Sequence, residues 1–153
     1  MEGGPYKCAS AAGAQTTACN AGTVVLTPQQ WGDKVRAATS WTGPWPRVSV
    51  WHGTADTTVN YQNLVETVKQ WTNVQGIDQT PDTSNTVAGY PHDVYKDASG
   101  NALVETYSIT GMNHGWPIDP GTGPLQCGTV GTYFNDVNIC GSYYAAQWLG
   151  LTS

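Results

Sequence analysis

Four cysteines, gathered as one pair near each end of the chain, constrain its fold more than any other feature. Neither pair, Cys8 with Cys19 or Cys127 with Cys140, has the C-x₂₋₄-C spacing of a structural zinc site, so disulfides are favoured over a metal site. Four cysteines allow three connectivities, and we expect near neighbours to pair because each pair lies within one glycine-rich loop. Each bridge then stabilises the fold by about 3 kcal/mol through chain entropy. Disulfides form in oxidising compartments, which predicts an extracellular protein.

The composition argues against two classes of partner. The 153 residues suit a single domain, which we expect to span 1–153. Hydrophobic residues make up 39% and charged residues only 11%, a profile common in secreted proteins. The net charge is −5 and there is no basic cluster, which argues against a nucleic-acid partner because phosphate binding requires Lys and Arg. No apolar run approaches the roughly 18–20 residues of a membrane span, so we expect no membrane partner.

Hydrophobic periodicity and turn residues divide the chain into helices and strands. In chain order we expect an irregular segment over 3–26, a helix opening at 27–28, a buried strand at 48–51, a helix from a cap at 60 to a glycine at 76, a polar loop over 77–90, hairpin strands at 92–96 and 102–109, a Gly/Pro-rich loop over 111–131, and a helix over 142–149. This order of elements is typical of the α/β class.

Two strand ends carry side chains suited to chemistry. Asp56 follows the buried strand at 48–51 through a glycine-containing turn, and His114 follows the strand at 102–109. Because ligands of open α/β sheets gather at the carboxyl ends of strands, we expect the two side chains to pair. A carboxylate fixes the tautomer of a paired imidazole and stabilises the imidazolium that forms when the ring accepts a proton. Aspartate before histidine is the chain order of α/β-hydrolases.

Five segments in order resemble the extracellular polyhydroxybutyrate depolymerase-type esterases, which are α/β-hydrolase relatives of the feruloyl and acetylxylan esterases. The segments are 3–8 (GGPYKC), 45–56 (WPRVSVWHGTAD), 113–115 (NHG), 117–121 (PIDPG) and 133–140 (YFNDVNIC). The resemblance implies a partial α/β-hydrolase fold, the C-terminal portion of a catalytic domain, with a mostly parallel sheet flanked by helices and a hairpin. It also implies hydrolysis of an ester or polyester without a cofactor, with Asp56 as triad acid and His114 as triad base.

The chain departs from this family at the nucleophile. The family's serine lies in a G-x-S-x-G elbow upstream of the Gly-Gly-Pro-Tyr segment, and the sequence begins after that point. None of the serines in the chain has this context. We therefore expect the chain to supply the acid and base of a Ser-His-Asp triad but no recognisable serine.

For the other candidate residues, a structural role is an alternative to a functional one. His52 and Asp56 could share a metal, but two ligands without a third favour a structural His52 and no metal site. Asp78 is an alternative to Asp56 as the acid, although its loop is typical of turn residues. Trp116, close to His114, is expected to line a cleft for an acyl group or polymer, with simple loop packing as the alternative.

Two functions from different classes remain open. The first is a secreted serine esterase whose serine comes from another chain or from an unrecognised position, or of which this sequence is a truncated piece. The second is a non-catalytic, aromatic-rich binding or structural fragment. Because the strand at 48–51 carries no charged residue and an incomplete sheet exposes an edge, we expect the chain to pair with its missing half or to form a homodimer.

Overall fold

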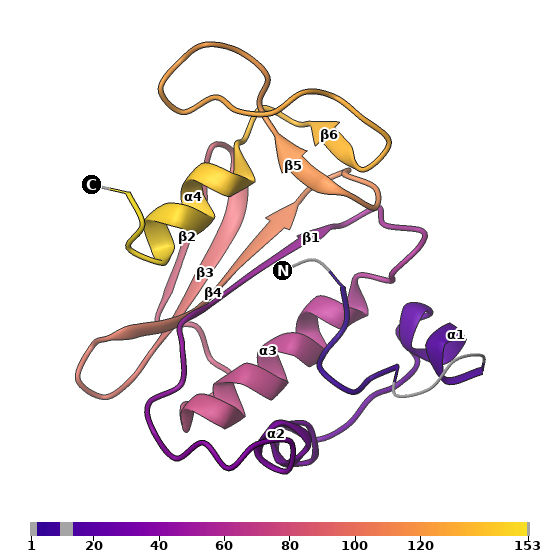
Figure 1. Ribbon diagram of the computed structural model, residues 1–153, viewed down its shortest axis with the longest axis vertical. Coiled ribbons are helices and arrows are strands. Elements are labelled where there is room, and N and C mark those ends of the chain that lie inside the picture. Colours follow the sequence, from indigo (N-terminus) through magenta and orange to yellow (C-terminus); the bar gives the residue numbers. More distant parts are fainter. Residues whose placement is uncertain (1–2, 10–13, 153) are drawn as a thin grey trace.

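The computed structural model describes residues 3–9 and 14–152 and contains four helices and six strands in that part of the chain (Figure 1). The elements are α1 (Ala14–Asn20), α2 (Pro28–Arg36), β1 (Val48–Gly53), α3 (Gln62–Gln75), β2 (Thr83–Val87), β3 (Tyr90–Lys96), β4 (Ala102–Ile109), β5 (Trp116–Ile118), β6 (Phe134–Asp136) and α4 (Gly141–Trp148). None of the described helices is long and apolar enough to cross a membrane.

The main sheet has the strand order β1-β4-β3-β2 and is mixed. β1 and β4 run parallel, whereas the β4–β3 and β3–β2 pairs are antiparallel. The α/β class is therefore confirmed, but the expectation of a mostly parallel sheet is wrong. The reason is the connections: β2, β3 and β4 follow one another through tight turns, which join only antiparallel neighbours, and α3 supplies the long crossover that a parallel pair needs.

One face of this sheet packs on α3. Alternating residues of β1 and β4, including Val48, Val50 and Val104, form a buried cluster with Leu64 and Val68 of the helix. The helix begins two residues after Asn60, whose side chain accepts a hydrogen bond from Gln62 N at 2.9 Å. Gly76 ends it in the left-handed conformation, as the sequence predicted.

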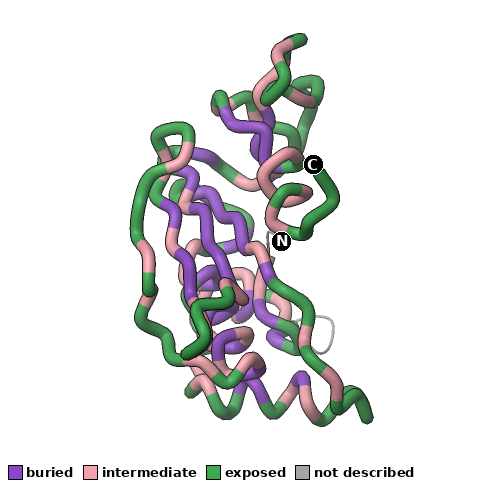
Figure 2. The backbone as a smooth tube through the Cα atoms, turned by 90° about the vertical axis from the view of Figure 1, so that its left-hand side faces the viewer, coloured by how far each residue is buried: buried purple, intermediate pink, exposed green. Residues whose placement is uncertain are grey.

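The other face packs on α4 and on the segment around β5. Trp51 and Tyr107, neighbours across the parallel pair, stack with ring centroids 3.8 Å apart and form a buried cluster with Ile109, Met112 and Ile139. Figure 2 shows the buried backbone concentrated in the strands and α3. β1 is thus covered on both faces, and all of its residues except Ser49 are buried.

A second layer is formed by α2 against α3. Thr27 caps α2 and Pro28 occupies its first turn, as the sequence predicted. Trp31 is fully buried, and its indole N–H donates to the carboxylate of Glu66 at 2.7 Å. The nearby segment was expected to be irregular throughout, but it contains α1, packed through the buried disulfide Cys8–Cys19.

The cysteines have the expected short-range connectivity, with the second disulfide joining Cys127 to Cys140. This second bridge ties a largely exposed loop to the start of α4. Two segments that were expected to be loops contain strands: β2 lies within 77–90 and β5 within 111–131. Both strands are short, and their polar or proline-containing sequences are not typical of strands. β2 is held by pairing with β3, and β5 pairs in parallel with β6.

Candidate active site

The parallel pairing of β1 with β4 brings two loops together at one edge of the sheet. Gly53 and Ile109, the last residues of the two strands, are partners in the register. Beyond them, Thr54 N donates to Ile109 O and Ala55 N donates to Met112 O, each at 3.0 Å. A Cβ at Gly53 would overlap the carbonyl oxygen of Met112, so only glycine permits this close approach.

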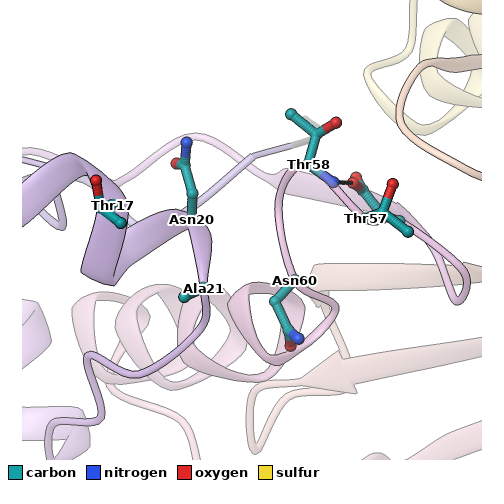
Figure 3. A pocket seen from close by; sticks show the side chains of 7 residues that line it. Thr17, Asn20, Ala21, Thr57, Thr58 and Asn60 are labelled. Carbon is teal, nitrogen blue, oxygen red and sulfur yellow. Dashed lines mark hydrogen bonds between the residues drawn. The ribbon is translucent and has the colours of Figure 1, made fainter.

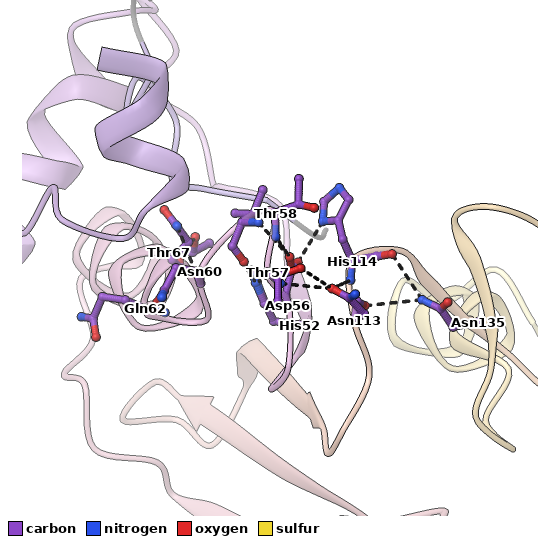
Figure 4. Close-up of polar contacts among 12 residues, drawn as sticks. His52, Asp56, Thr57, Thr58, Asn60, Gln62, Thr67, Asn113, His114 and Asn135 are labelled. Atoms are coloured by element: carbon purple, nitrogen blue, oxygen red, sulfur yellow. Dashed lines mark hydrogen bonds and ion pairs between the residues drawn. The ribbon is translucent and has the colours of Figure 1, made fainter. Parts of the chain in front are cut away.

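Asp56 lies in the loop after β1 with its carboxylate fully buried. One oxygen, Oδ1, accepts hydrogen bonds from the backbone N–H groups of Thr58 at 2.8 Å and Val59 at 2.7 Å. The other, Oδ2, lies 2.8 Å from Nδ1 of His114 (Figure 4). The backbone donors stabilise the ionised carboxylate and fix the direction of its second oxygen. The expected pairing of Asp56 with His114 is present in the structure.

The pairing with Asp56 determines how His114 is protonated. An ionised carboxylate only accepts hydrogen bonds, so Nδ1 carries the proton and Nε2 of the neutral ring carries the free lone pair. Among the described residues no hydrogen-bond partner is recorded for Nε2, and the His114 side chain is 28% exposed. The exposed nitrogen can therefore accept a proton from a group that approaches the loop.

Asn113 connects the two loops and was missed in the sequence. Its Oδ1 accepts hydrogen bonds from the backbone N–H of Thr57 at 3.1 Å and from that of His114 at 2.8 Å. From the far side, Asn135 Nδ2 donates to the carbonyl oxygens of Asn113 and His114, each at 3.4 Å. The Asn-His-Gly and Tyr-Phe-Asn segments of the family resemblance contain both residues, and this was the available signal.

The glycine after His114 is required by its surroundings. Gly115 has a φ of +145°, and a Cβ there would lie 2.8 Å from the carbonyl oxygen of Tyr133. The Tyr133 ring, which is exposed, lies edge-on to the imidazole of His114 with centroids 5.9 Å apart. The segment before β6 thus forms one wall beside the histidine.

His52 belongs to the same cluster. It is fully buried, and its Nε2 lies 2.8 Å from the carbonyl oxygen of Val59 and 3.5 Å from Oδ2 of Asp56. Burial lowers the pKa of His52, outweighing the opposite effects of the Val59 carbonyl and Asp56. The described residues contain no group of three His, Cys, Asp or Glu side chains that could hold a metal.

The remaining candidates lie elsewhere. The exposed Asp78 accepts a hydrogen bond from Thr80 N at 2.7 Å, as a turn residue does. Trp116 starts β5, and its indole N–H donates to Ser142 Oγ at 3.0 Å. With Ile118 and Phe134 it lines a cavity of about 320 Å³, in which neither Asp56 nor His114 is a lining residue.

A larger cleft lies beside Asp56. It has a volume of about 650 Å³, and its lining is mainly polar side chains from α1 and from the Asp56 loop (Figure 3). The lining residues are Thr17, Asn20, Ala21, Asp56, Thr57, Thr58 and Asn60. Asp56 therefore lies between the edge of the sheet and this cleft.

Sequence comparison finds close relatives among esterases. The chain is 56% identical over 152 residues to poly(3-hydroxyalkanoate) depolymerase C of Paucimonas lemoignei, covering 99% of the chain and 36% of that protein. It is 50% identical over 100 residues to an acetylxylan esterase of Coprinopsis cinerea, covering 65% of the chain and 26% of that protein. The chain thus spans about a third or less of the length of these relatives. No protein-family profile matches it.

Structure comparison supports the same relationship. A solved PHB depolymerase complexed with an R3HB trimer superposes with a TM-score of 0.59 at 17% identity, over 96% of this chain and 40% of that one. At this identity the match shows the fold alone, a partial α/β-hydrolase fold. The sequence relatives place the chain in the family of polyhydroxybutyrate depolymerase-type esterases, which includes the related acetylxylan and feruloyl esterases.

Proposed function

We propose that the chain is one portion of the catalytic domain of a secreted carboxylic-ester hydrolase and supplies the acid and base of a Ser-His-Asp triad. The observation that carries the proposal is the 2.8 Å hydrogen bond between the buried Asp56 and the partly exposed His114. The two disulfides and the family relationship support a secreted protein. The nucleophilic serine comes from a segment outside these 153 residues, because no G-x-S-x-G sequence occurs within them.

The protonation state of His114 fits the first step of such a reaction. Nε2 of His114 accepts the proton of the serine hydroxyl while Oγ attacks the ester carbonyl, and Asp56 stabilises the imidazolium that forms. The imidazolium then gives this proton to the departing alkoxide, which leaves as the alcohol. In the second half of the reaction His114 deprotonates a water molecule that attacks the acyl-enzyme, and the serine recovers its proton as the acid leaves.

The relatives and the aromatic surface near His114 support a proposal for the substrate class. One relative is named for a poly(3-hydroxyalkanoate), and the solved PHB depolymerase holds an R3HB trimer, so a polyester of 3-hydroxy acids is the proposed substrate. The exposed Tyr133 beside His114 offers an aromatic surface for it. Trp116, which lines the apolar cavity next to β5, is proposed to contact the same chain of acyl groups.

Reconstitution tests the proposal. The chain is mixed with the part of the Paucimonas lemoignei depolymerase that lies outside the aligned region, and hydrolysis of a 3-hydroxybutyrate oligomer is measured. We expect hydrolysis only in the mixture, loss of it with His114→Ala, and retention with His92→Ala, which removes a histidine outside the site. Hydrolysis that survives His114→Ala, or a stable complex that binds the oligomer without cleaving it, would overturn the proposal. The second result would support a non-catalytic binding fragment.

A further inference from the structure

The surroundings of His52 provide a hydrogen-bond acceptor for only one of its two ring nitrogens. Its Nε2 faces the carbonyl oxygen of Val59 at 2.8 Å, and a carbonyl only accepts, so the proton is on Nε2. The other nitrogen, Nδ1, is buried and has no hydrogen-bond partner among the described residues. A second proton on Nδ1 would create a buried N–H without an acceptor, which is costly.

The proton on Nε2 also faces the acid of the proposed triad. Oδ2 of Asp56, the oxygen that bonds to His114, lies 3.5 Å from Nε2 of His52, and both side chains are fully buried. The N–H is hydrogen-bonded to Val59, and Oδ2 of Asp56 lies beside it at the longer distance of 3.5 Å. A charged His52 would compete with His114 for this carboxylate, whereas a neutral one leaves the charge of Asp56 to His114.

The other neighbours do not favour a charged His52: burial lowers the pKa of His52, and the Coulombic effect of His114 acts in the same direction. Tyr61, at the start of α3, meets the His52 ring edge-on with centroids 5.8 Å apart, and its hydroxyl is bonded to Ser108 Oγ at 2.6 Å. On the side of His114, Tyr133 is the remaining titratable side chain in ring contact. Asp56 is therefore the ionised group that both histidines share.

We infer that His52 is a positioning residue for the pair Asp56–His114: it stays neutral, holds its Nε2–H beside the oxygen of Asp56 that bonds to His114, and so reserves the negative charge for His114. The inference rests on the proposed roles of Asp56 and His114. His52 is then a third member of the site and lies on β1, the strand that precedes Asp56. In this role His52 neither touches the substrate nor transfers a proton.

Nitrogen-15 NMR of the imidazole rings tests this on the whole chain, which has only three histidines. In the wild-type protein we expect His52 to remain the neutral Nε2–H tautomer as the pH falls from about 7 to 5, a range in which an ordinary histidine gains its proton. A protonated His52 in that range, or a neutral ring with the proton on Nδ1, would overturn the inference.

Two variants of His52 distinguish a positioning role from a role in packing alone, because their effect is measured on His114. In His52→Leu, which removes the N–H beside Oδ2 of Asp56, we expect the Nδ1–H proton resonance of His114 to move downfield, because Asp56 then accepts the hydrogen bond of His114 more strongly. His52→Gln restores an N–H near the position of Nε2 and should return this resonance to its wild-type position. His92→Gln is the matched control outside the site. An unchanged Nδ1–H resonance of His114 in folded His52→Leu contradicts the inference.

The readout is independent of the proposed esterase activity. If the reconstituted protein fails to cleave esters while His52 behaves as expected, the proposed function fails and the charge distribution within the cluster stands. If cleavage occurs but His52 gains a proton with ordinary affinity, the positioning role fails and the esterase stands. Should His52→Leu not fold, the wild-type tautomer measurement still decides the inference.

Discussion

Nδ1 of His114 lies 2.8 Å from Oδ2 of Asp56, although the two residues are separated by 58 positions in the sequence. The backbone brings the two residues together. β1 and β4 are parallel neighbours, and hydrogen bonds join the loops that follow them, which carry Asp56 and His114. The same arrangement gives His114 the tautomer that a general base needs.

Asp56→Asn should abolish most of the activity of the reconstituted esterase while leaving the fold intact. An amide presents an N–H as readily as an oxygen toward His114, so the ring can adopt the wrong tautomer, and kcat should fall by about 10⁴-fold. The rate of oligomer hydrolysis measures this, and circular dichroism checks the fold. Asp78→Asn, in an exposed turn, should keep wild-type activity. The reverse ranking of the two variants would assign the acid to Asp78.

Gly53→Ala should destabilise the protein because its methyl group would overlap the Met112 carbonyl oxygen. The strand end and the His114 loop must separate to admit it, at a cost of about 1–3 kcal/mol. Denaturant unfolding measures the change. Gly131→Ala is the matched control, since a Cβ there makes an ordinary contact, 3.5 Å from Phe134. Equal stability of the two variants would mean that the loops do not approach as closely as described.

Glu66→Gln should lower the free energy of unfolding in a pH-dependent way. Burial raises the pKa of Glu66, but hydrogen bonds from Lys69, Trp31, Gln62 and Leu26 outweigh it and hold the pKa below its usual value. A depressed folded pKa stabilises the fold above the unfolded pKa of about 4.5, and this contribution is lost as the pH falls through the folded pKa. The wild type should therefore exceed the variant by about 1–3 kcal/mol at neutral pH.

The difference between the two proteins should narrow as the pH falls below about 4.5 in denaturant titrations repeated at several pH values. Asp33→Asn is the control, because Asp33 pairs with Arg36 on the surface and should affect stability little at any pH. A difference between wild type and Glu66→Gln that does not depend on pH would show that the charge of Glu66 is not what stabilises this layer.

β1 should associate with another strand in solution. It is the edge strand of the sheet, and its sequence, VSVWHG, carries no acidic or lysine side chain to discourage pairing. We expect sedimentation of the isolated chain to show a dimer at high concentration. Ser49→Lys, a change within β1, should shift the equilibrium to the monomer. A wild-type chain that sediments as a monomer at every concentration would contradict this expectation.

The sequence predicted those parts of the fold that depend on local signals. The Thr27 cap, the Gly76 helix end and the hairpin of β3 and β4 were all identified, because each is set by a few neighbouring residues. The strands β2 and β5 were missed because pairing with β3 and with β6 outweighs the polar or proline-containing sequence of each.

The site was predictable in part for the same reason. Asp56 and His114 each follow a recognisable strand, so their meeting could be expected from topology. The contribution of Asn113 depends on where its side chain points, and that of His52 depends on a carbonyl seven residues away. The spacing of residues in the sequence does not show where either side chain points. The position of Trp116 beside a separate cavity likewise required the three-dimensional arrangement of β5 and β6.

Labelling with a fluorophosphonate, which reacts covalently with activated serines, tests the central claim most directly. The chain alone and the chain mixed with the part of the Paucimonas lemoignei relative outside the aligned region are labelled, and the modified residue is located by mass spectrometry. The account predicts no labelling of the chain alone, and labelling of one serine in the added part in the mixture, lost with His114→Ala. Stoichiometric labelling of a serine within the isolated chain, or labelling of the mixture that does not depend on His114, would contradict it.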